Sequence, residues 1–249
     1  MLKIINYKKS LKSNDFLKEL SICSDETNAH LKKLLPPKSE EKLFDAINYS
    51  VFSGGKRFRA FLVIQAARLL EVPKVRALQA ASAIEIIHTY SLVHDDLPSM
   101  DNDDFRRGKP TVHIKWNEAT AVLVGDALQA FAYQILSYKE THPKSEVRLN
   151  LIKTLSEASG FNGMVLGQSK DLEAEKNYKI LGMKEIINLQ KLKTGALFNW
   201  SLKSANILAE ENNDSLKKYA ESIGLAFQIK DDLLDHEGTM EKTGKKVGK

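Results

Sequence analysis

Apolar side chains recur at intervals of three and four residues along most of the chain, and this spacing is the feature that most limits its fold. Leu78, Ala81, Ile84 and Ile87, for example, fall on one face of a helix. The 249 residues include only six prolines and thirteen glycines, too few breaks for many short strands. We therefore predict an all-α protein, and the length fits one domain over residues 1–249.

Prolines and glycines divide the helical pattern into segments. A proline pair at 36–37 separates two early helices, a glycine pair at 54–55 opens a third, and Pro98 ends a long segment from about 74 to 96. The stretch at 98–113 is charged and contains glycine and proline, which is typical of a functional loop. Further helices are predicted near 117–138, 145–168, 184–207 and 212–236.

The distribution of charge and cysteine narrows the class of protein. The net charge is +5, but the surplus lies in residues 1–60, which hold twelve Lys or Arg against seven Asp or Glu. No basic stripe with interleaved aromatic residues occurs, so we expect no nucleic-acid partner and interpret the surplus as solvated or as attracting phosphorylated small molecules. The single cysteine, Cys23, allows no internal disulfide. With no signal peptide and no transmembrane segment predicted, we expect a cytoplasmic protein.

Two clusters of aspartates each follow an apolar stretch that is predicted to be a buried helix. They are Asp95, Asp96 and Asp101 in the first cluster and Asp231, Asp232 and Asp235 in the second. A run of acids is often a solvated face, but unpaired charge beside a buried helix is expensive. If the clusters face each other across a cavity, divalent cations would neutralise them and bridge to phosphate oxygens. Mg²⁺ suits such a site, because it prefers carboxylate and phosphate oxygens.

Basic residues accompany the aspartates. Gly54 and Gly55 let the chain turn closely into a helix, and a helix N-terminus with several cations favours a polyanion. The basic candidates are Lys56, Arg57, Arg59, His88, Arg106, Arg107, Lys193 and Lys245. Basic residues at a helix start are more often solvated, but the paired acid clusters reverse that balance and imply two bound diphosphates.

At this point the sequence resembles the trans-isoprenyl diphosphate synthases, in particular their bacterial farnesyl diphosphate synthase (geranyltranstransferase) branch. The matching motifs are GGKRFR at 54–59, IHTYSLVHDDLPSMDNDDFRRGKPT at 87–111, GQSKD at 167–171, KTG at 193–195 and FQIKDDLLD at 227–235. The resemblance implies an antiparallel helical bundle around a central apolar cavity, usually homodimeric, with both acid motifs at the cavity mouth. Related enzymes continue for several tens of residues, so the C-terminal helices of the family are expected to be missing after Lys249.

The resemblance also assigns roles to residues at matching positions. The principal magnesium ligands are expected to be Asp95, Asp101 and Asp231, supported by Asp96, Asp232 and Asp235. Three Mg²⁺ ions, with Mn²⁺ as a possible substitute, are expected to hold the allylic diphosphate. Residues beside the reacting carbon correspond to Lys193 and Thr194, which join Asp95, Asp101 and Asp231 in the expected catalytic set.

Two substrate sites follow from the same correspondence. The isopentenyl diphosphate site is expected to contain Lys56, Arg57, His88 and Arg107, and Gly55 and Arg59 of the first motif are further expected substrate-binding residues. The allylic diphosphate is expected to contact Arg106, Lys193, Gln228 and Lys245. A supporting role near the metals falls to Gln168 and Asp171.

The expected reaction follows from charge. Loss of diphosphate from an allylic carbon leaves a cation, and metal ions with lysine and arginine around the leaving group stabilise the developing charge. The double bond of isopentenyl diphosphate attacks the cation, and loss of a proton completes the new bond. Similar enzymes that stop at C15 carry an aromatic residue where Tyr90 stands and two extra residues matching Pro98 and Ser99. The main product is therefore expected to be farnesyl diphosphate, with the C20 geranylgeranyl diphosphate as the alternative.

Helix geometry alone does not aim Tyr90 at the cavity. Five residues rotate its side chain by about 140° from that of Asp95. The orientation is implied by the resemblance, and a core tyrosine with a satisfied hydroxyl is the other interpretation.

Three other functions fit parts of the sequence. Glu85 and His88 match the Glu-x-x-His element of di-iron bundles, but none of the other five histidines has a glutamate three residues before it. A non-catalytic subunit of a heteromeric prenyl synthase should have lost acids from one motif, whereas both motifs are complete. A terpene cyclase would not need a second diphosphate site, which the basic residues at 54–59, His88 and Arg107 are expected to form.

Overall fold

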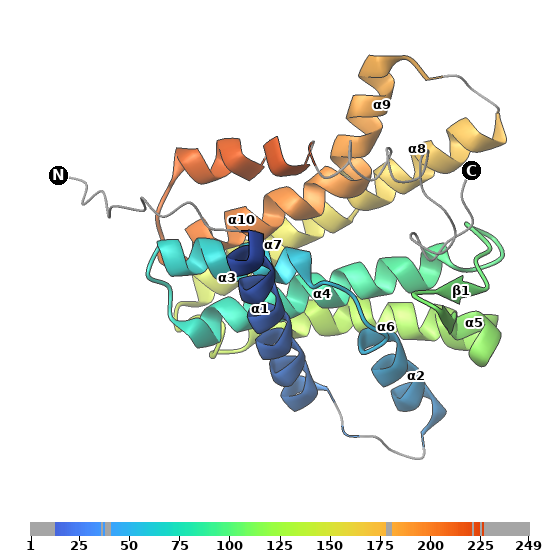
Figure 1. Ribbon diagram of the computed structural model, residues 1–249, viewed down its shortest axis with the longest axis horizontal. Helices are drawn as coiled ribbons and strands as arrows, with labels where there is room; N and C mark the ends of the chain where they lie inside the picture. The colour runs from blue at the N-terminus through green and yellow to red at the C-terminus, as the bar shows by residue number, and fades with distance from the viewer. Residues whose placement is uncertain are drawn as a thin grey trace.

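The computed structural model describes residues 13–35, 37, 41–177, 181–220, 222–224 and 226, and most of these residues are helical (Figure 1). The helices are α1 (Ser13–Leu34), α2 (Lys42–Val51), α3 (Phe58–Leu69), α4 (Lys74–Asp95), α5 (Val112–Lys115), α6 (Glu118–Ser137), α7 (Ser145–Ser159), α8 (Met164–Lys176), α9 (Met183–Gln190), the π-helical turn η1 (Lys191–Gly195) and α10 (Ala196–Ala209). Residues 214–220 are also helical. Two short strands, β1 (Phe105–Arg106) and β2 (Lys109–Pro110), pair antiparallel within the predicted loop at 98–113.

Helix α4 lies within the bundle and is buried along most of its length. Its sequence is rich in alanine and isoleucine and contains no glycine or proline, so it favours helix while leaving no polar face for solvent. It packs against α1, α3, α6 and α10. The helix ends at Asp95, three residues before Pro98, and its C-terminus therefore delivers the first aspartate cluster to one end of the bundle.

Helix α10 fixes its neighbours through two large aromatic side chains that are fully buried. The Phe198 ring lies 5.9 Å from that of Phe58 at the start of α3. The indole Nε1 of Trp200 donates a hydrogen bond of 3.1 Å to Oγ1 of Thr154 on α7. These contacts hold η1, which leads directly into α10, in place against the core.

One predicted helix, 145–168, was wrong, because the chain breaks between Gly160 and Gly163. Helix α7 ends at Ser159 and α8 begins at Met164. A Cβ atom on Gly163 would lie 2.0 Å from the carbonyl oxygen of Ala158, so the chain at this break passes too close to α7 for any larger residue. The break lets α8 take its own direction and reach η1, which it contacts.

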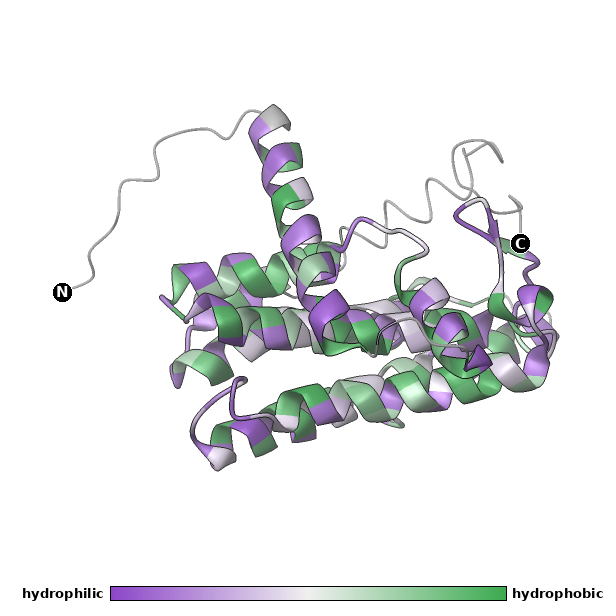
Figure 2. Cartoon of the chain, turned by 90° about the horizontal axis from the view of Figure 1, so that it is seen from below, coloured by the Kyte–Doolittle hydropathy of each residue, from purple (hydrophilic) through white to green (hydrophobic). Residues whose placement is uncertain are grey.

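Helix α6 is long and apolar enough to cross a membrane by length and composition. It packs against α2, α4, α5 and α7, as the core helix of a bundle does. Figure 2 shows hydrophilic and hydrophobic residues sharing the same helices across the molecule. Part of the outer face of α6 is apolar, however, because Val122 and Leu123 are 41% and 54% exposed.

Candidate active site

The end of α4 folds the first aspartate cluster back on itself. The Asp101 N–H donates a 2.8 Å hydrogen bond to the Asp95 carbonyl, and the Asn102 N–H donates one of 3.1 Å to that of Leu97. Asp96 is the C-terminal cap of the helix. Carboxylates at a helix C-terminus face the negative end of the helix dipole, so this arrangement calls for nearby positive charge.

The pKa of Asp95 reports the same shortage of positive charge. Burial, and after it the negative charge of Asp101, raise it to about 6, and the cations of Lys193 and Arg106 oppose the shift only in part. A divalent cation would supply the missing charge, and oxygen donors of this kind are those that Mg²⁺ prefers. The residues present at the end of α4 therefore fit one side of a metal site.

The structure does not by itself complete that metal site. Among the residues it describes, no three carboxylate, histidine or cysteine side chains come together closely enough to hold an ion. The second cluster, with Asp231, Asp232 and Asp235, lies outside the described residues, as do Gln228 and Lys245. That the two aspartate clusters face each other across a cavity thus stays a prediction.

Asp96 is engaged by an arginine from the short hairpin. The Arg106 Nε on β1 donates to both carboxylate oxygens of Asp96, at 2.7 and 2.9 Å, and its Nη2 donates to one of them. Burial opposes the charge of Arg106, but hydrogen bonding and attraction from Asp96 raise its pKa overall. The expected metal ligand Asp96 and the expected allylic contact Arg106 therefore bind each other in this structure.

Lys193 reaches the acid end of α4 from the π-helical turn η1. Its Nζ forms an ion pair of 2.5 Å with Oδ2 of Asp171 on α8. Helix α8 can approach because Gly167 has no side chain: a Cβ atom there would lie 2.2 Å from the Lys193 backbone nitrogen. The wide turn thus joins the predicted GQSKD and KTG motifs, and π-turns are frequent at functional sites. Gln168 is buried, and Thr194 is half-buried on the same turn.

Four arginines lie near enough to His88 to act on its charge. Burial lowers the pKa of His88 well below its ordinary value, and the positive charges of Arg59, Arg107, Arg106 and Arg57 lower it further. A neutral imidazole among arginines can donate a hydrogen bond without adding another cation. Such a concentration of positive charge, opposite in sign to the aspartate cluster, is suited to a polyanion.

The two glycines of the first motif pack against one of these arginines. Gly54 and Gly55 have φ of 107° and 120°, a region that favours glycine. The Gly54 carbonyl accepts a hydrogen bond from Nη1 of Arg107. A Cβ atom on Gly55 would lie 2.8 Å from the Arg107 guanidinium, so the glycine allows the arginine to lie flat on the loop.

Arg57 is placed differently from the rest of the predicted diphosphate contacts. It is buried, with 5% of its surface exposed, whereas Lys56 beside it is exposed. Nε of Arg57 donates 3.1 Å to Oδ1 of Asn28, Nη1 lies 3.3 Å from a Glu85 oxygen, and Nη2 donates to the Val51 carbonyl. The guanidinium of Arg57 is therefore bound by partners within the protein. The sequence did not indicate that Glu85 would be one of these partners.

Tyr90 faces α6. Its side chain is buried, and its ring meets that of His94 edge-on at 5.8 Å. Burial raises its pKa to about 12, and Gln129 on α6 opposes this only partly. Among the described residues no partner meets hydrogen-bond geometry at the hydroxyl, although the Gln129 side chain is near it, so both interpretations of Tyr90 stay predictions.

The comparisons with known proteins agree with this geometry. The family model of polyprenyl synthetases matches residues 40–249. The chain belongs to the polyprenyl synthetase family. The farnesyl diphosphate synthase of Haemophilus influenzae is 47% identical over 211 residues, which cover 83% of this chain and 70% of that protein. A geranylgeranyl diphosphate synthase of Cyanophora paradoxa is 40% identical over 223 residues, covering 88% of this chain and 74% of that protein.

A solved structure confirms the fold of this polyprenyl synthetase. An FPP/GFPP synthase from Zymomonas mobilis aligns with a TM-score of 0.82 at 47% identity, over 88% of this chain and 81% of that one. The predicted all-α, isoprenoid-synthase-type fold and the predicted prenyltransferase class are thereby confirmed. Enzymes of this family depend on metal ions in general, in agreement with the acid end of α4.

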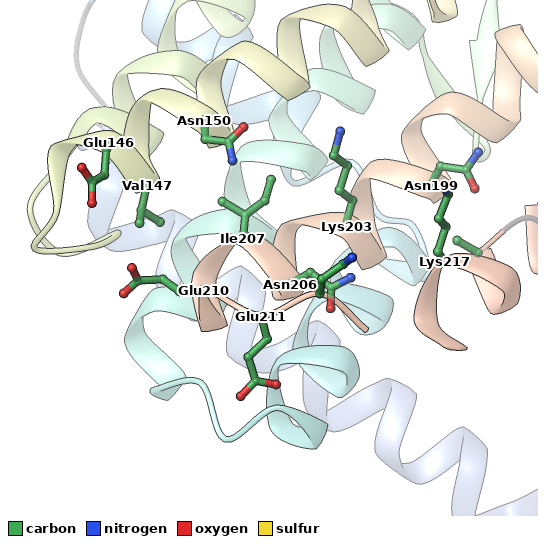
Figure 3. A pocket seen from close by; sticks show the side chains of 12 residues that line it. Glu146, Val147, Asn150, Asn199, Lys203, Asn206, Ile207, Glu210, Glu211 and Lys217 are labelled. Carbon is green, nitrogen blue, oxygen red and sulfur yellow. The ribbon is translucent and has the colours of Figure 1, made fainter. Parts of the chain in front are cut away.

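Two pockets of this polyprenyl synthetase lie away from the predicted site. One of about 810 Å³ is lined by α7, α10 and the residues that follow α10, including Asn150, Lys203 and Glu210 (Figure 3). The other, of about 540 Å³, is lined partly by Tyr49 and Trp116. Neither is lined by a residue that the sequence predicted to be functional, so neither bears on the prenyltransferase site.

Proposed function

We propose that this polyprenyl synthetase condenses dimethylallyl or geranyl diphosphate head to tail with isopentenyl diphosphate, giving farnesyl diphosphate and inorganic diphosphate. One observation carries the proposal: an acidic group around Asp95, with Lys193 near it, lies beside a group of arginines that act on His88, and Arg106 belongs to both groups. Two anionic substrates of different roles need such a division. Farnesyl diphosphate synthases are also prominent among the relatives of the chain.

The metal at the acidic group is proposed to be Mg²⁺, with three ions per site and Mn²⁺ as a substitute. Asp95, Asp101 and Asp231 would hold it, and Asp96 would join only if it exchanged Arg106 for the ion. When bound, the metal would neutralise the allylic diphosphate as a leaving group. The raised pKa of Asp95 supports this assignment, since its carboxylate lacks sufficient positive charge without an ion.

The protein's own side chains would divide the remaining work. The Lys193 ammonium stabilises the negative charge that develops on the allylic diphosphate as its carbon–oxygen bond breaks. Arg59, Arg107 and His88 hold isopentenyl diphosphate so that its double bond faces the allylic cation. The electron pair of that double bond forms the new carbon–carbon bond, and the proton then lost goes to the released diphosphate.

Product analysis tests this function directly. Purified protein incubated with dimethylallyl diphosphate, isopentenyl diphosphate and Mg²⁺, followed by dephosphorylation, is expected to give mainly farnesol. Mainly geranylgeraniol would replace C15 by the C20 alternative. A cyclic hydrocarbon formed from the allylic substrate alone would favour a terpene cyclase, and no turnover by the protein alone would favour a non-catalytic subunit.

Tyr90 is proposed to limit product length. Removal of its ring by Tyr90→Ala opens space between α4 and α6, where Tyr90 lies near Gln129. We expect products longer than C15 to become the main fraction, measured by chromatography of the prenyl alcohols. Tyr219→Ala is the control, because Tyr219 is 52% exposed. An unchanged C15 product from Tyr90→Ala would remove the residue from this role.

A homodimer is the proposed assembly, with a second copy covering the apolar outer face of α6. Val122 and Leu123 give that face its exposed apolar surface, and a dimer would bury it. Leu123→Asp is expected to lower the mass measured by light scattering from twice 28.0 kDa toward 28.0 kDa. Leu69→Asp on α3, where the leucine is 62% exposed, should leave the mass unchanged. A wild-type mass of one chain would contradict the dimer.

A further inference from the structure

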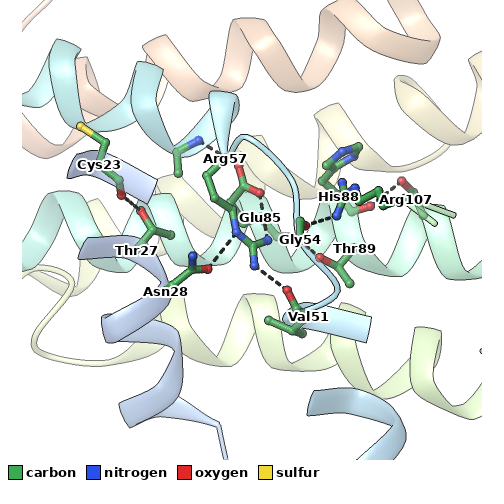
Figure 4. A network of polar contacts seen from close by, with 12 residues as sticks. Cys23, Thr27, Asn28, Val51, Gly54, Arg57, Glu85, His88, Thr89 and Arg107 are labelled. Atoms are coloured by element: carbon green, nitrogen blue, oxygen red, sulfur yellow. Dashed lines mark hydrogen bonds and ion pairs between the residues drawn. The ribbon is translucent and has the colours of Figure 1, made fainter. Parts of the chain in front are cut away.

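Glu85 is a buried carboxylate that the proposed reaction does not use. It lies on α4, one turn before His88, and is 3% exposed. Its Oε2 is 3.3 Å from Nη1 of Arg57, and its Oε1 accepts a 3.0 Å hydrogen bond from the backbone N–H of Ala60 (Figure 4). The Glu-x-x-His pattern that resembles a di-iron element thus has another explanation, since Glu85 is committed to Arg57 and α3.

The Ala60 contact caps the start of α3. Ala60 is the third residue of that helix, so its N–H has no partner within the helix. A carboxylate at this place also interacts favourably with the positive end of the helix dipole. Glu85 therefore fixes the N-terminal turn of α3, and with it Arg59.

Arg57, which is bound to Glu85, also fixes the end of the loop before α3. Its backbone has φ of 51°, a left-handed conformation that is uncommon outside glycine and that needs support from surrounding contacts. Its guanidinium supplies that support by binding Asn28 on α1, the Val51 carbonyl at the end of α2 and Glu85 on α4. Three helices thus determine where the loop ends.

The loop held in this way carries much of the proposed isopentenyl diphosphate site. Lys56 precedes Arg57 directly, Arg59 follows on α3, and the Gly54 carbonyl binds Arg107. Glu85 also compensates the charge of Arg57, which is one of the cations around His88. A change at Glu85 would move or unbalance several phosphate contacts together, although its own oxygens point into the protein.

We propose that Glu85, acting through Arg57 and the Ala60 N–H, is a positioning residue for the isopentenyl diphosphate site and does not itself touch substrate. This rests on the proposed function, in which that site receives the second diphosphate. The allylic site depends instead on Asp95 at the C-terminal end of α4, on Asp101 in the turn beyond it and on Lys193 in η1. Loss of the Glu85 contacts should therefore affect the two substrates unequally.

Steady-state kinetics of Glu85→Gln test the proposal. The amide keeps an oxygen for Ala60 but loses the charge that balances Arg57. We expect KM for isopentenyl diphosphate to rise about tenfold or more, as losses of supporting contacts commonly do, while kcat and KM for geranyl diphosphate stay within about twofold. Glu19→Gln is the matched control, because Glu19 pairs with Arg68 at the surface, and it should change neither KM.

The outcomes separate this proposal from the assignment of the enzyme. If the wild type forms no prenyl product, the proposed function fails before Glu85 is tested. If the wild type is active and Glu85→Gln leaves both KM values unchanged, or raises both equally, the positioning role is overturned. Should Glu85→Gln fold poorly, Arg57→Lys keeps a cation for Glu85 and loses the contacts to Asn28 and Val51. It is expected to raise KM for isopentenyl diphosphate selectively, and an unselective effect would also overturn the proposal.

Discussion

Replacing Gly167 by alanine is expected to reduce kcat/KM by about 100-fold, because misplacing a catalytic group by about 1 Å can have an effect of that size. The added Cβ would lie 2.2 Å from the Lys193 nitrogen and 2.5 Å from its Cα. These are backbone atoms, so no side-chain rotation relieves the clash, and α8 must move away from η1. The ion pair between Lys193 and Asp171 would then be broken or displaced.

The stability change in Gly167→Ala should have an unusual sign for a helical position. Alanine in place of glycine ordinarily stabilises a helix by about 0.5–1 kcal/mol, whereas overpacking here should destabilise the protein by about 1–3 kcal/mol. Denaturant unfolding and steady-state kinetics measure the two effects. Gly182→Ala is the control, because its added Cβ would lie 3.7 Å from a Glu185 oxygen, an ordinary contact. Wild-type activity in Gly167→Ala would show that α8 and η1 need not meet so closely.

The second large effect is expected from Asp95→Asn, which should lower kcat by about 10²–10³-fold, the size typical of losing one group that stabilises transition-state charge. Metal binding should weaken as well, so the Mg²⁺ concentration for half-maximal activity should rise. Asp104→Asn makes the same charge change in the adjoining loop at an exposed side chain, and it should have little effect.

Asp95→Asn should not cost stability in the absence of metal. Burial and the charge of Asp101 raise the pKa of Asp95, which means that the folded protein disfavours its carboxylate. A neutral amide of the same shape removes that unfavourable charge, so the thermal midpoint in the presence of a chelator should stay the same or increase. A large decrease in the midpoint, with activity lost in proportion, would indicate that Asp95 supports the fold rather than the reaction.

Much of this arrangement could be predicted from the sequence because it follows from local patterns. The apolar faces of α4 and the proline beyond its end predicted a helix that delivers aspartates to one end of the bundle. The resemblance implied that Lys193 and the GQSKD segment would serve the same site, and the structure brings Lys193 and Asp171 together. The second aspartate cluster and its distance from Asp95 stay predictions.

Other features depend on tertiary contacts that spacing does not reveal. Arg57 and Arg59 are two residues apart and chemically identical, yet the left-handed backbone at Arg57 turns its side chain toward Glu85, while the Arg59 guanidinium lies 4.7 Å from the Phe198 ring. The break between α7 and α8 was missed because glycines within an apolar pattern are compatible with a continuous helix. The signal that could have identified Glu85 is a lone acid among buried isoleucines.

The π-turn at Lys191–Gly195 has a consequence for how this part of the chain can change. Such a turn contains one residue more than a regular helical turn, so the side chains of α9 are offset by about 100° from the faces that they would have in an unbroken continuation of α10. Deletion of a single residue from this turn would shorten the helix only slightly, but it would turn the Lys193 side chain away from Asp171 and Asp95. The segment should therefore tolerate many substitutions at exposed positions and very few changes in its residue count.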